Sequence, residues 1–152
     1  MDIFAKIKRD HDEARDMMDQ IIKTPNAKER MALFEALKVA ILSHAKSEEK
    51  TFYNAIKDIE EWGEEVPHFK HEHKDAEKLF GEIEQCDPND TLWWEKFGEL
   101  RKALTHHMEE EEKEVFPDIK KEFESSEAKE LGAEMEKLEE KMKEKLEQEV
   151  AA

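Results

Sequence analysis

The feature that most constrains the fold of this chain is a set of histidines and glutamates at positions where helical spacing predicts apolar side chains. One run recurs in steps of three and four, the spacing of a buried helix face. A buried carboxylate is costly unless it is paired, and a metal ion is a common partner of a His and a Glu one turn apart. The run therefore predicts a pair of metal ligands. It comprises Trp93, Phe97, Leu100, Leu104, His107, Glu111 and Val115.

Composition and turn signals predict a chain built of helices. Charged residues, mostly Glu and Lys, make up 43% of it, and no stretch alternates convincingly as a strand. Asn26 and Asp90 stand where helix caps are expected. Pro67 suits the first turn of a helix, whereas Pro117 is expected to kink or shorten one. The four expected long helices span residues 2–23, 27–62, 67–85 and 91–123.

The last part of the chain is expected to form a fifth, amphipathic helix from Ser125 or Ser126. Its apolar residues lie on one side, and the other faces are almost entirely Glu and Lys. We expect it to pack on the first four helices or on its copy in a dimer, so the protein would be a monomer or a homodimer. The predicted division is residues 1–123 and residues 124–152. The apolar positions are Leu131, Met135, Leu138, Met142, Leu146 and Val150.

The chain also repeats itself. The segment DHDEARDMMDQI, from Asp10, aligns with EHKDAEKLFGEI, from Glu72. The segment HAKSEEKTFY, from His44, aligns with HMEEEEKEVF, from His107, at nearly the same separation. Two repeated helical hairpins that close on each other predict an all-α, up-and-down four-helix bundle, in which equivalent positions face one interior.

The polar residues on the four inner faces are four imidazoles and two carboxylates at a similar depth. They exceed the needs of one small ion but suit two ions that share both carboxylates as bridges. Imidazole and carboxylate without thiolate favour iron, with manganese or zinc as alternatives. Two six-coordinate ions would keep places for a bridging oxygen and for a small exogenous molecule. The predicted ligands are His11, His44, Glu48, His73, His107 and Glu111.

These motifs resemble those of hemerythrin-like proteins of the HHE cation-binding type, over residues 1 to about 123. The resemblance implies a non-haem di-iron centre, oxo- or hydroxo-bridged, that binds O₂ or related small ligands such as NO and peroxide. It also implies the four histidines as terminal ligands and the two glutamates as bridges. The motifs that carry it are DH at Asp10, HxxxEE at His44, EH at Glu72, and HxxxEE followed by VFP at His107.

The chain departs from the oxygen-carrying hemerythrins in two places. Glu77 stands where they have a second histidine in the third helix. In the fourth helix their histidine is followed by an aspartate five residues later, whereas here Glu111 follows at four and Glu112 at five. Fewer histidines and more carboxylates stabilise the ferric state, so reversible O₂ carriage is less firmly implied than the fold.

Three functions are therefore open. We favour a binding protein for O₂ or a related small ligand over an enzyme, with an apolar shell protecting the bound ligand. The alternative is an oxidoreductase that consumes peroxide or NO, or oxidises ferrous iron. A third function is an iron or oxygen sensor that acts through a partner contacting the fifth helix. The shell residues are Leu37, Ile41, Phe80, Leu100 and Leu104.

Histidines near the ligand set leave alternatives. His106 competes with His107, because a glutamate follows each by four residues, and helical phase favours His107. His68 and His71 are out of phase and are expected in solvent. Glu77 borders the inner face, either as an extra ligand or as a water-bridged outer group.

Other polar and aromatic residues near the ligand set are expected to have supporting roles. Glu49, Glu72 and Glu112 either orient imidazoles through their free ring nitrogens or lie solvated at the surface. Tyr53 and Trp93 are expected to have packing roles.

Charge and cysteine content narrow the partners and the compartment. The net charge of -16 argues against nucleic acid and anionic membranes and suits a surface that attracts cations. Cys86 is the only cysteine, which excludes an internal disulfide and fits a reducing cytosol. The N-terminus has no apolar signal-peptide region, and no apolar run approaches the ~20 residues of a membrane span. We expect a cytoplasmic protein.

Overall fold

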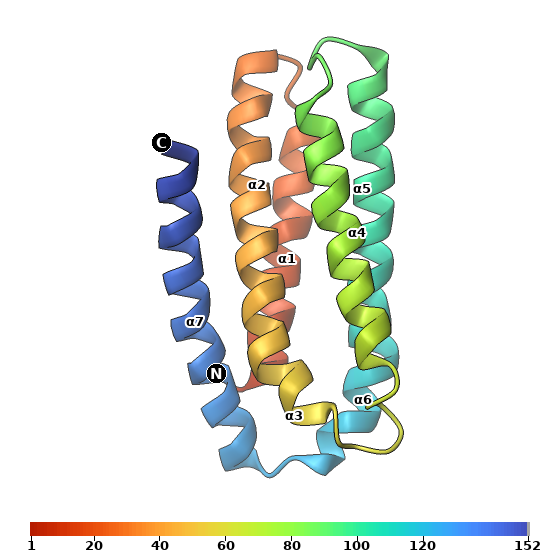
Figure 1. The fold of residues 1–152 in the computed structure, drawn as a ribbon, viewed down its shortest axis with the longest axis vertical. Helices are drawn as coiled ribbons and strands as arrows, with labels where there is room; N and C mark the ends of the chain where they lie inside the picture. The colour runs from red at the N-terminus through yellow and green to blue at the C-terminus, as the bar shows by residue number, and fades with distance from the viewer. Residues whose placement is uncertain (152) are drawn as a thin grey trace.

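Four long helices run alternately up and down, as the internal repeat predicts (Figure 1). The computed structural model describes residues 1–151. No strand occurs in that range, so the all-α prediction is confirmed. Nor does any helix in it combine the length and the apolar character needed to cross a membrane. The four helices are α1 (Ile3–Ile22), α2 (Ala27–Glu48), α4 (Val66–Glu84) and α5 (Thr91–Glu110).

Side-chain caps set the starts of α1 and α2. Asp2 accepts a hydrogen bond from the backbone amide of Ala5 at 2.8 Å, and Asn26 accepts one from that of Glu29 at 3.0 Å. Each such cap stabilises its helix by about 1 kcal/mol. Asp90 occupies the capping position of α5, but its side chain makes no capping hydrogen bond. The predicted position of that cap is therefore confirmed, whereas its predicted contact is not made.

Two π-helical segments occur at the inward glutamates: the first begins directly after Glu48, and the second begins with Glu111 itself. The first, η1 (Glu49–Tyr53), continues α2 into the short α3 (Asn54–Ile56). The second, η2 (Glu111–Val115), continues α5 into α6 (Phe116–Ile119), after which the 3₁₀ turn η3 (Lys120–Glu122) ends the helix. A π turn holds one more residue than an α turn, so it changes which side chains face the interior, and such turns are frequent at functional sites.

The second and fourth helices differ from the predicted spans. The second ends at Ile56 rather than at residue 62, because residues 57–65 form turns. A Cβ at Gly63 would clash there with the carbonyl of Lys57. The predicted fourth helix is interrupted by η2, and Pro117 lies in the first turn of α6, a position that proline favours.

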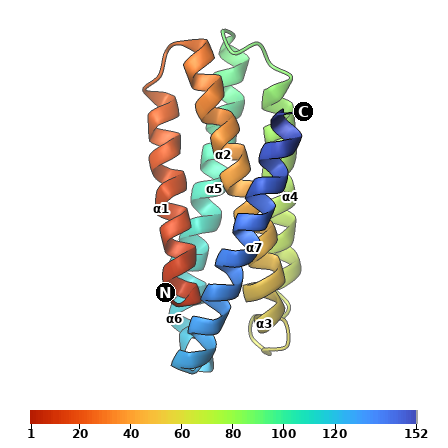
Figure 2. The same ribbon diagram turned by 90° about the vertical axis from the view of Figure 1, so that its left-hand side faces the viewer.

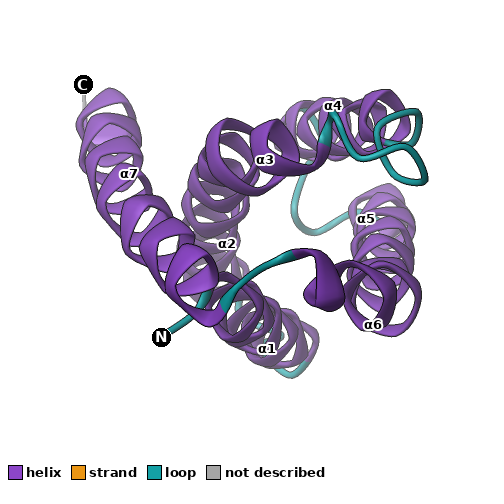
Figure 3. Ribbon diagram, turned by 90° about the horizontal axis from the view of Figure 1, so that it is seen from below, coloured by secondary structure: helices purple, strands orange, loops and turns teal. Residues whose placement is uncertain are grey.

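A fifth long helix, α7 (Ser125–Ala151), packs against α1 and α2 outside the ring of four helices (Figures 2 and 3). At Gly132 it approaches the chain start so closely that a Cβ would clash with the carbonyl of Met1. Met135 is fully buried, while the side chain of Val150 lies outside the described part. The structure thus places α7 on the first four helices, the first of the two predicted arrangements. The division into residues 1–123 and 124–152 stays a prediction. Partly buried are Leu131, Leu138, Met142 and Leu146.

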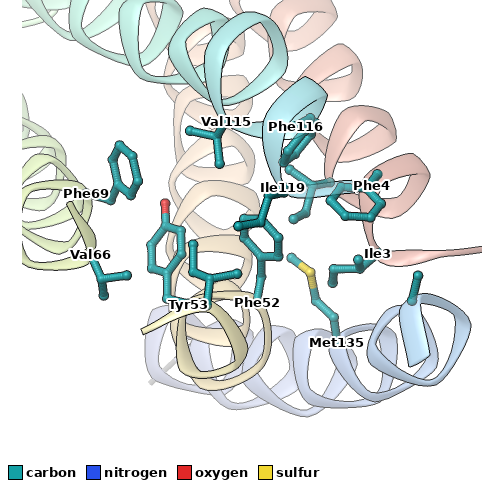
Figure 4. Close-up of a cluster of buried hydrophobic side chains, with 13 residues drawn as sticks. Ile3, Phe4, Phe52, Tyr53, Val66, Phe69, Val115, Phe116, Ile119 and Met135 are labelled. Atoms are coloured by element: carbon teal, nitrogen blue, oxygen red, sulfur yellow. The ribbon is translucent and has the colours of Figure 1, made fainter. Parts of the chain in front are cut away.

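Two apolar clusters fill the interior, above and below a polar layer in the orientation of Figure 1. Along each of the four helices, the inward polar residues separate the two clusters. The lower cluster lies at the end of the bundle that carries α3 and α6 (Figure 4). It includes Phe52, Tyr53, Phe69, Val115 and Phe116. The upper cluster includes Phe34, Leu37, Phe80, Trp93 and Phe97.

Candidate metal centre

Four histidines and two glutamates meet in the polar layer between the upper and lower clusters. The side chains of Glu48 and Glu111 are inaccessible to solvent, and that of His73, the most exposed of the six, is only 10% exposed. The structure therefore brings all six predicted residues together, and their role as ligands stays a prediction. They are His11 from α1, His44 and Glu48 from α2, His73 from α4, His107 from α5 and Glu111 from η2.

The six side chains form two groups of three, each of which could hold one metal ion. Within each group one nitrogen or oxygen atom per residue lies within 4.8 Å of the others. Ligand atoms surround a small ion at such spacing. The first group comprises His11, His44 and Glu111, and the second comprises Glu48, His73 and His107.

Each glutamate lies between histidines of both groups. Oε1 of Glu111 is 3.3 Å from Nε2 of His11 and also 3.3 Å from Nε2 of His107. Oε1 of Glu48 lies in the same way between two histidines, 3.5 and 3.3 Å from their Nε2 atoms. A carboxylate between two ligand groups is placed to bridge two ions.

Each of the four imidazoles forms a hydrogen bond with a carboxylate on the side away from the centre. In each pair the ring Nδ1 lies 2.7 or 2.8 Å from a carboxylate oxygen. With Nδ1 as the donor, the lone pair of Nε2 faces the interior, the orientation that a metal ligand needs. The pairs are His11 with Glu112, His44 with Asp10, His73 with Glu49, and His107 with Glu72.

The outer carboxylates follow the internal repeat. Glu49, Glu72 and Glu112 each hydrogen-bond an imidazole. Of the two roles left open by the sequence, orienting an imidazole or lying solvated at the surface, they have the first. Asp10 was missed as a partner of His44, although it precedes a histidine just as Glu72 does in the second half. The repeat was the signal that could have identified it.

Histidines and glutamates in the centre shift each other's proton affinity. Burial lowers the pKa of His107, but the charge of Glu111 and the hydrogen bonds to Glu111 and Glu72 together outweigh it and bring the pKa to about 10. Burial also lowers the pKa of His44, but Glu48 and Asp10 together raise it well above the ordinary value. For Glu111, burial raises the pKa, but the charge of His107 together with the neighbouring hydrogen bonds holds it well below the usual range. The site thus keeps Glu111 ionised, the form that binds metal.

Several buried polar atoms in the centre lack a hydrogen-bond partner within the described residues. Each unpaired buried polar group costs roughly 1–3 kcal/mol, so a small cation among them would be favoured. Within the same part of the chain, neither Glu48 nor Glu111 forms a salt bridge with a lysine or arginine. The residues present therefore fit a pair of cations. The unpaired atoms are Nε2 of His11 and His44, both carboxylate oxygens of Glu48, and Oε1 of Glu111.

Tyr53 reaches the centre from the lower cluster, where Figure 4 shows its hydroxyl pointing away from α7. The hydroxyl donates to Oε2 of Glu111 at 3.1 Å and lies 3.2 Å from Nε2 of His107. Burial and the nearby carboxylates raise the pKa of Tyr53 well above its ordinary value, so it stays a donor. The sequence predicted only a packing role for Tyr53 and missed this contact. In a regular α-helix Phe52, four residues after Glu48, would face the centre, whereas the extra residue of the π turn lets Tyr53 face it.

The remaining candidates lie away from the centre. Glu77 is exposed and lines a groove beside α7, so the structure does not bring it to the ligands. His106 is exposed and His107 is buried, as helical phase predicts. His68 and His71 are exposed, which confirms the expectation for both.

A small cavity adjoins the centre on the side of the upper cluster. Its volume is about 40 Å³. One water needs roughly 10–15 Å³ by this measure, so the space suits a molecule of two or three heavy atoms. Of the predicted apolar shell, Ile41 and Leu104 line it, and the other three residues lie in the upper cluster. Its wall also includes His11, His44, His73, Ala14, Ala40, Ala45 and Met108.

Comparison with protein families gives a match that covers most of the chain. The family model for the hemerythrin HHE cation binding domain matches residues 2–119, from the cap of α1 to the end of α6. The search of curated proteins and that of solved structures gave no match.

Proposed function

The chain belongs to the hemerythrin HHE cation-binding family, a family of metal-cation-binding domains, and from this premise we propose that it is a non-haem di-iron protein. We propose further that it binds O₂, or a related small ligand such as NO or peroxide, at that centre. One ion would be held by the first group of three residues and the other by the second group. Glu48 and Glu111 would bridge them.

The donor set supports iron. Imidazole nitrogen and carboxylate oxygen are ligands that iron accepts readily, and no thiolate lies among the six residues. Bound iron would supply one-electron redox chemistry and open coordination positions for a small ligand. The outer carboxylates keep every Nε2 directed inward, so the chain supplies ligands that are already oriented.

The observation that carries the ligand proposal is the cavity of about 40 Å³ beside the centre. Three of the predicted ligand histidines line it, so a molecule inside it would lie next to the ions. Side chains such as Ile41, Leu104 and Met108 make the larger part of the remaining wall apolar, and four charged residues complete it, Asp10, Glu13, Glu139 and Lys143. The small volume favours diatomic molecules and peroxide over any larger substrate.

Metal analysis and absorption spectra test this proposal. Protein from iron-supplemented cells should hold two irons per chain, and it should show near-ultraviolet and visible bands that differ between air and argon. Glu48→Gln should lower the iron content, because it removes a bridging charge. Glu77→Gln is the matched control and should keep both irons, since Glu77 is exposed and away from the centre. A colourless protein that retains only zinc would contradict the proposal.

Turnover separates binding from catalysis. A stable, reversible adduct with one small molecule per centre supports the binding function. Destruction of many equivalents of peroxide or NO per centre, or repeated oxidation of ferrous iron, would instead support the oxidoreductase.

One observation favours the sensor as a second candidate. Asp10 accepts from Nδ1 of His44 and from the amine of Lys6, and that amine lies 3.0 Å from a carboxylate oxygen of Glu139 in α7. This chain of contacts joins α7 to a predicted ligand. If metal regulates α7, proteolytic cleavage of α7 should differ between metal-free and metal-loaded protein, and equal cleavage would count against the sensor.

A further inference from the structure

Two more histidine and glutamate pairs lie outside the centre, on α4 and α5. His68 and Glu72 are one helical turn apart on α4, and His106 and Glu110 have the same spacing on α5. These helices are antiparallel neighbours, so the two pairs meet across the contact between them (Figure 1). The proposed centre uses neither His68 nor His106.

Distances between the two pairs suit a single metal ion. Nε2 of His68 lies 3.6 Å from Oε1 of Glu72 and 3.7 Å from Oε1 of Glu110. Nε2 of His106 lies 3.3 Å from the other oxygen of Glu110. Adjacent ligands of a tetrahedral ion, with bonds of about 2.1 Å, are roughly 3.4 Å apart. His68, Glu72 and Glu110 each offer one ligand atom within 4.8 Å of the others, so these three side chains could hold one ion. His106 adjoins them through Glu110 and could supply a fourth ligand after a rotation of its side chain.

Exposure and charge also favour a cation here. The side chains of Glu72 and Glu110 are only 17% exposed, whereas those of His68 and His106 are 50% and 69% exposed. Within the described part of the chain, neither glutamate forms a salt bridge with a lysine or arginine, and their partners are imidazoles. Two close carboxylates thus lack a fixed positive partner, and a hydrated ion can reach the imidazoles.

One carboxylate joins this group to the buried centre. Oε1 of Glu72 faces His68 at the surface and also accepts a hydrogen bond from Nδ1 of His107 at 2.8 Å. His107 is one of the six predicted ligands. The surface group therefore lies one side chain away from the centre.

We propose that His68, Glu72, Glu110 and His106 form a third metal site, which takes up a divalent transition-metal ion from solvent and supplies it to the buried centre. Imidazole and carboxylate ligands suit Fe²⁺, Mn²⁺ and Zn²⁺. The supply role rests on the proposed function, whereas the surface site stands without it.

The test compares zinc binding by the full chain and by a double variant, His68→Ala with His106→Ala. Both side chains are exposed, and the change leaves the contact between Glu72 and His107 in place. His71→Ala is the matched control, since His71 is 71% exposed on the same helix, where it pairs with Asp75. Calorimetric titration of metal-free protein should give three zinc ions for wild type and control. The double variant should bind two, or bind the third at least about tenfold more weakly.

Two further measurements separate the surface site from the centre. Anomalous diffraction from zinc-soaked crystals of wild type should show an ion between the four side chains. Uptake of Fe²⁺ by the buried centre under argon, followed by stopped flow, should be slower in the double variant, with an unchanged final content of two irons in that centre.

Each outcome has a defined meaning. Equal zinc binding by wild type and double variant, or no ion at this place in the crystal, overturns the surface site. Uptake of Fe²⁺ at the wild-type rate overturns the supply role. A wild type that binds one zinc ion, lost in the double variant, supports the surface site and contradicts the buried centre.

Discussion

Replacement of Tyr53 by phenylalanine tests whether its hydroxyl stabilises the centre. Phenylalanine keeps the ring and leaves no cavity, so the change removes the hydrogen bond to Glu111. Oε1 of Glu111 is already unpaired within the described residues, and the variant would leave Oε2 unpaired as well. A hydrogen bond to a charged group contributes about 1.5–3 kcal/mol. We expect the free energy of unfolding of the metal-free protein to fall by about 2 kcal/mol, and its Tm by roughly 4–8 °C.

Urea unfolding at neutral pH with a chelator present, followed by circular dichroism, measures this loss. In metal-loaded protein the loss should be smaller, because a bound ion satisfies the carboxylate of Glu111. Phe52→Leu is the control, since Phe52 is a fully buried neighbour without a polar contact to the centre. It should cost about 1–2 kcal/mol whether or not metal is present.

Two results would refute the reasoning on Tyr53. A loss below about 0.5 kcal/mol in chelator, the range of neutral surface changes, would mean that the hydroxyl does not stabilise Glu111. An equal loss with and without metal would mean that the hydroxyl acts independently of the centre.

Three further predictions concern pH and the packing of α7. In chelator, the free energy of unfolding should fall as pH rises from 6.5 towards 10, by up to about 5 kcal/mol, because the folded pKa of His107 is about 10 against 6.5 unfolded; urea titrations at several pH values would show it, and a rise would contradict it. Burial and Asp10 raise the pKa of Glu139 from 4.5 to about 7, so the folded state favours its protonated form and loses stability as pH rises from 4.5 to 7. Glu139→Gln should make this fall in the free energy of unfolding smaller, as urea titrations over that pH range would show. Gly132→Ala should speed proteolytic removal of α7 through its clash with Met1, whereas Gly81→Ala, where a Cβ meets nothing within 4 Å, should not.

Much of the centre could be predicted from local spacing. Inward positions such as His44 and Glu48 follow helical periodicity, and the repeat places His107 and Glu111 at the equivalent depth of the second half. The all-α fold followed from the same pattern and is confirmed. The π turns at the two glutamates could not be predicted, because nothing in the residue spacing distinguishes them from continued α-helix. The contact of Tyr53 with Glu111 depends on such a turn, and it was therefore missed.

Local pattern thus decided which helices form and which polar side chains each turns inward, since both depend on residues three and four positions apart. The tertiary structure decided which groups meet across helices: Asp10 with His44, α7 with α1 and α2, and the pairs of His68 and His106 at the surface. These contacts depend on the rotation and height of each helix relative to its neighbours. The packing of the apolar clusters above and below the polar layer sets both quantities, and no single segment of the chain contains that information.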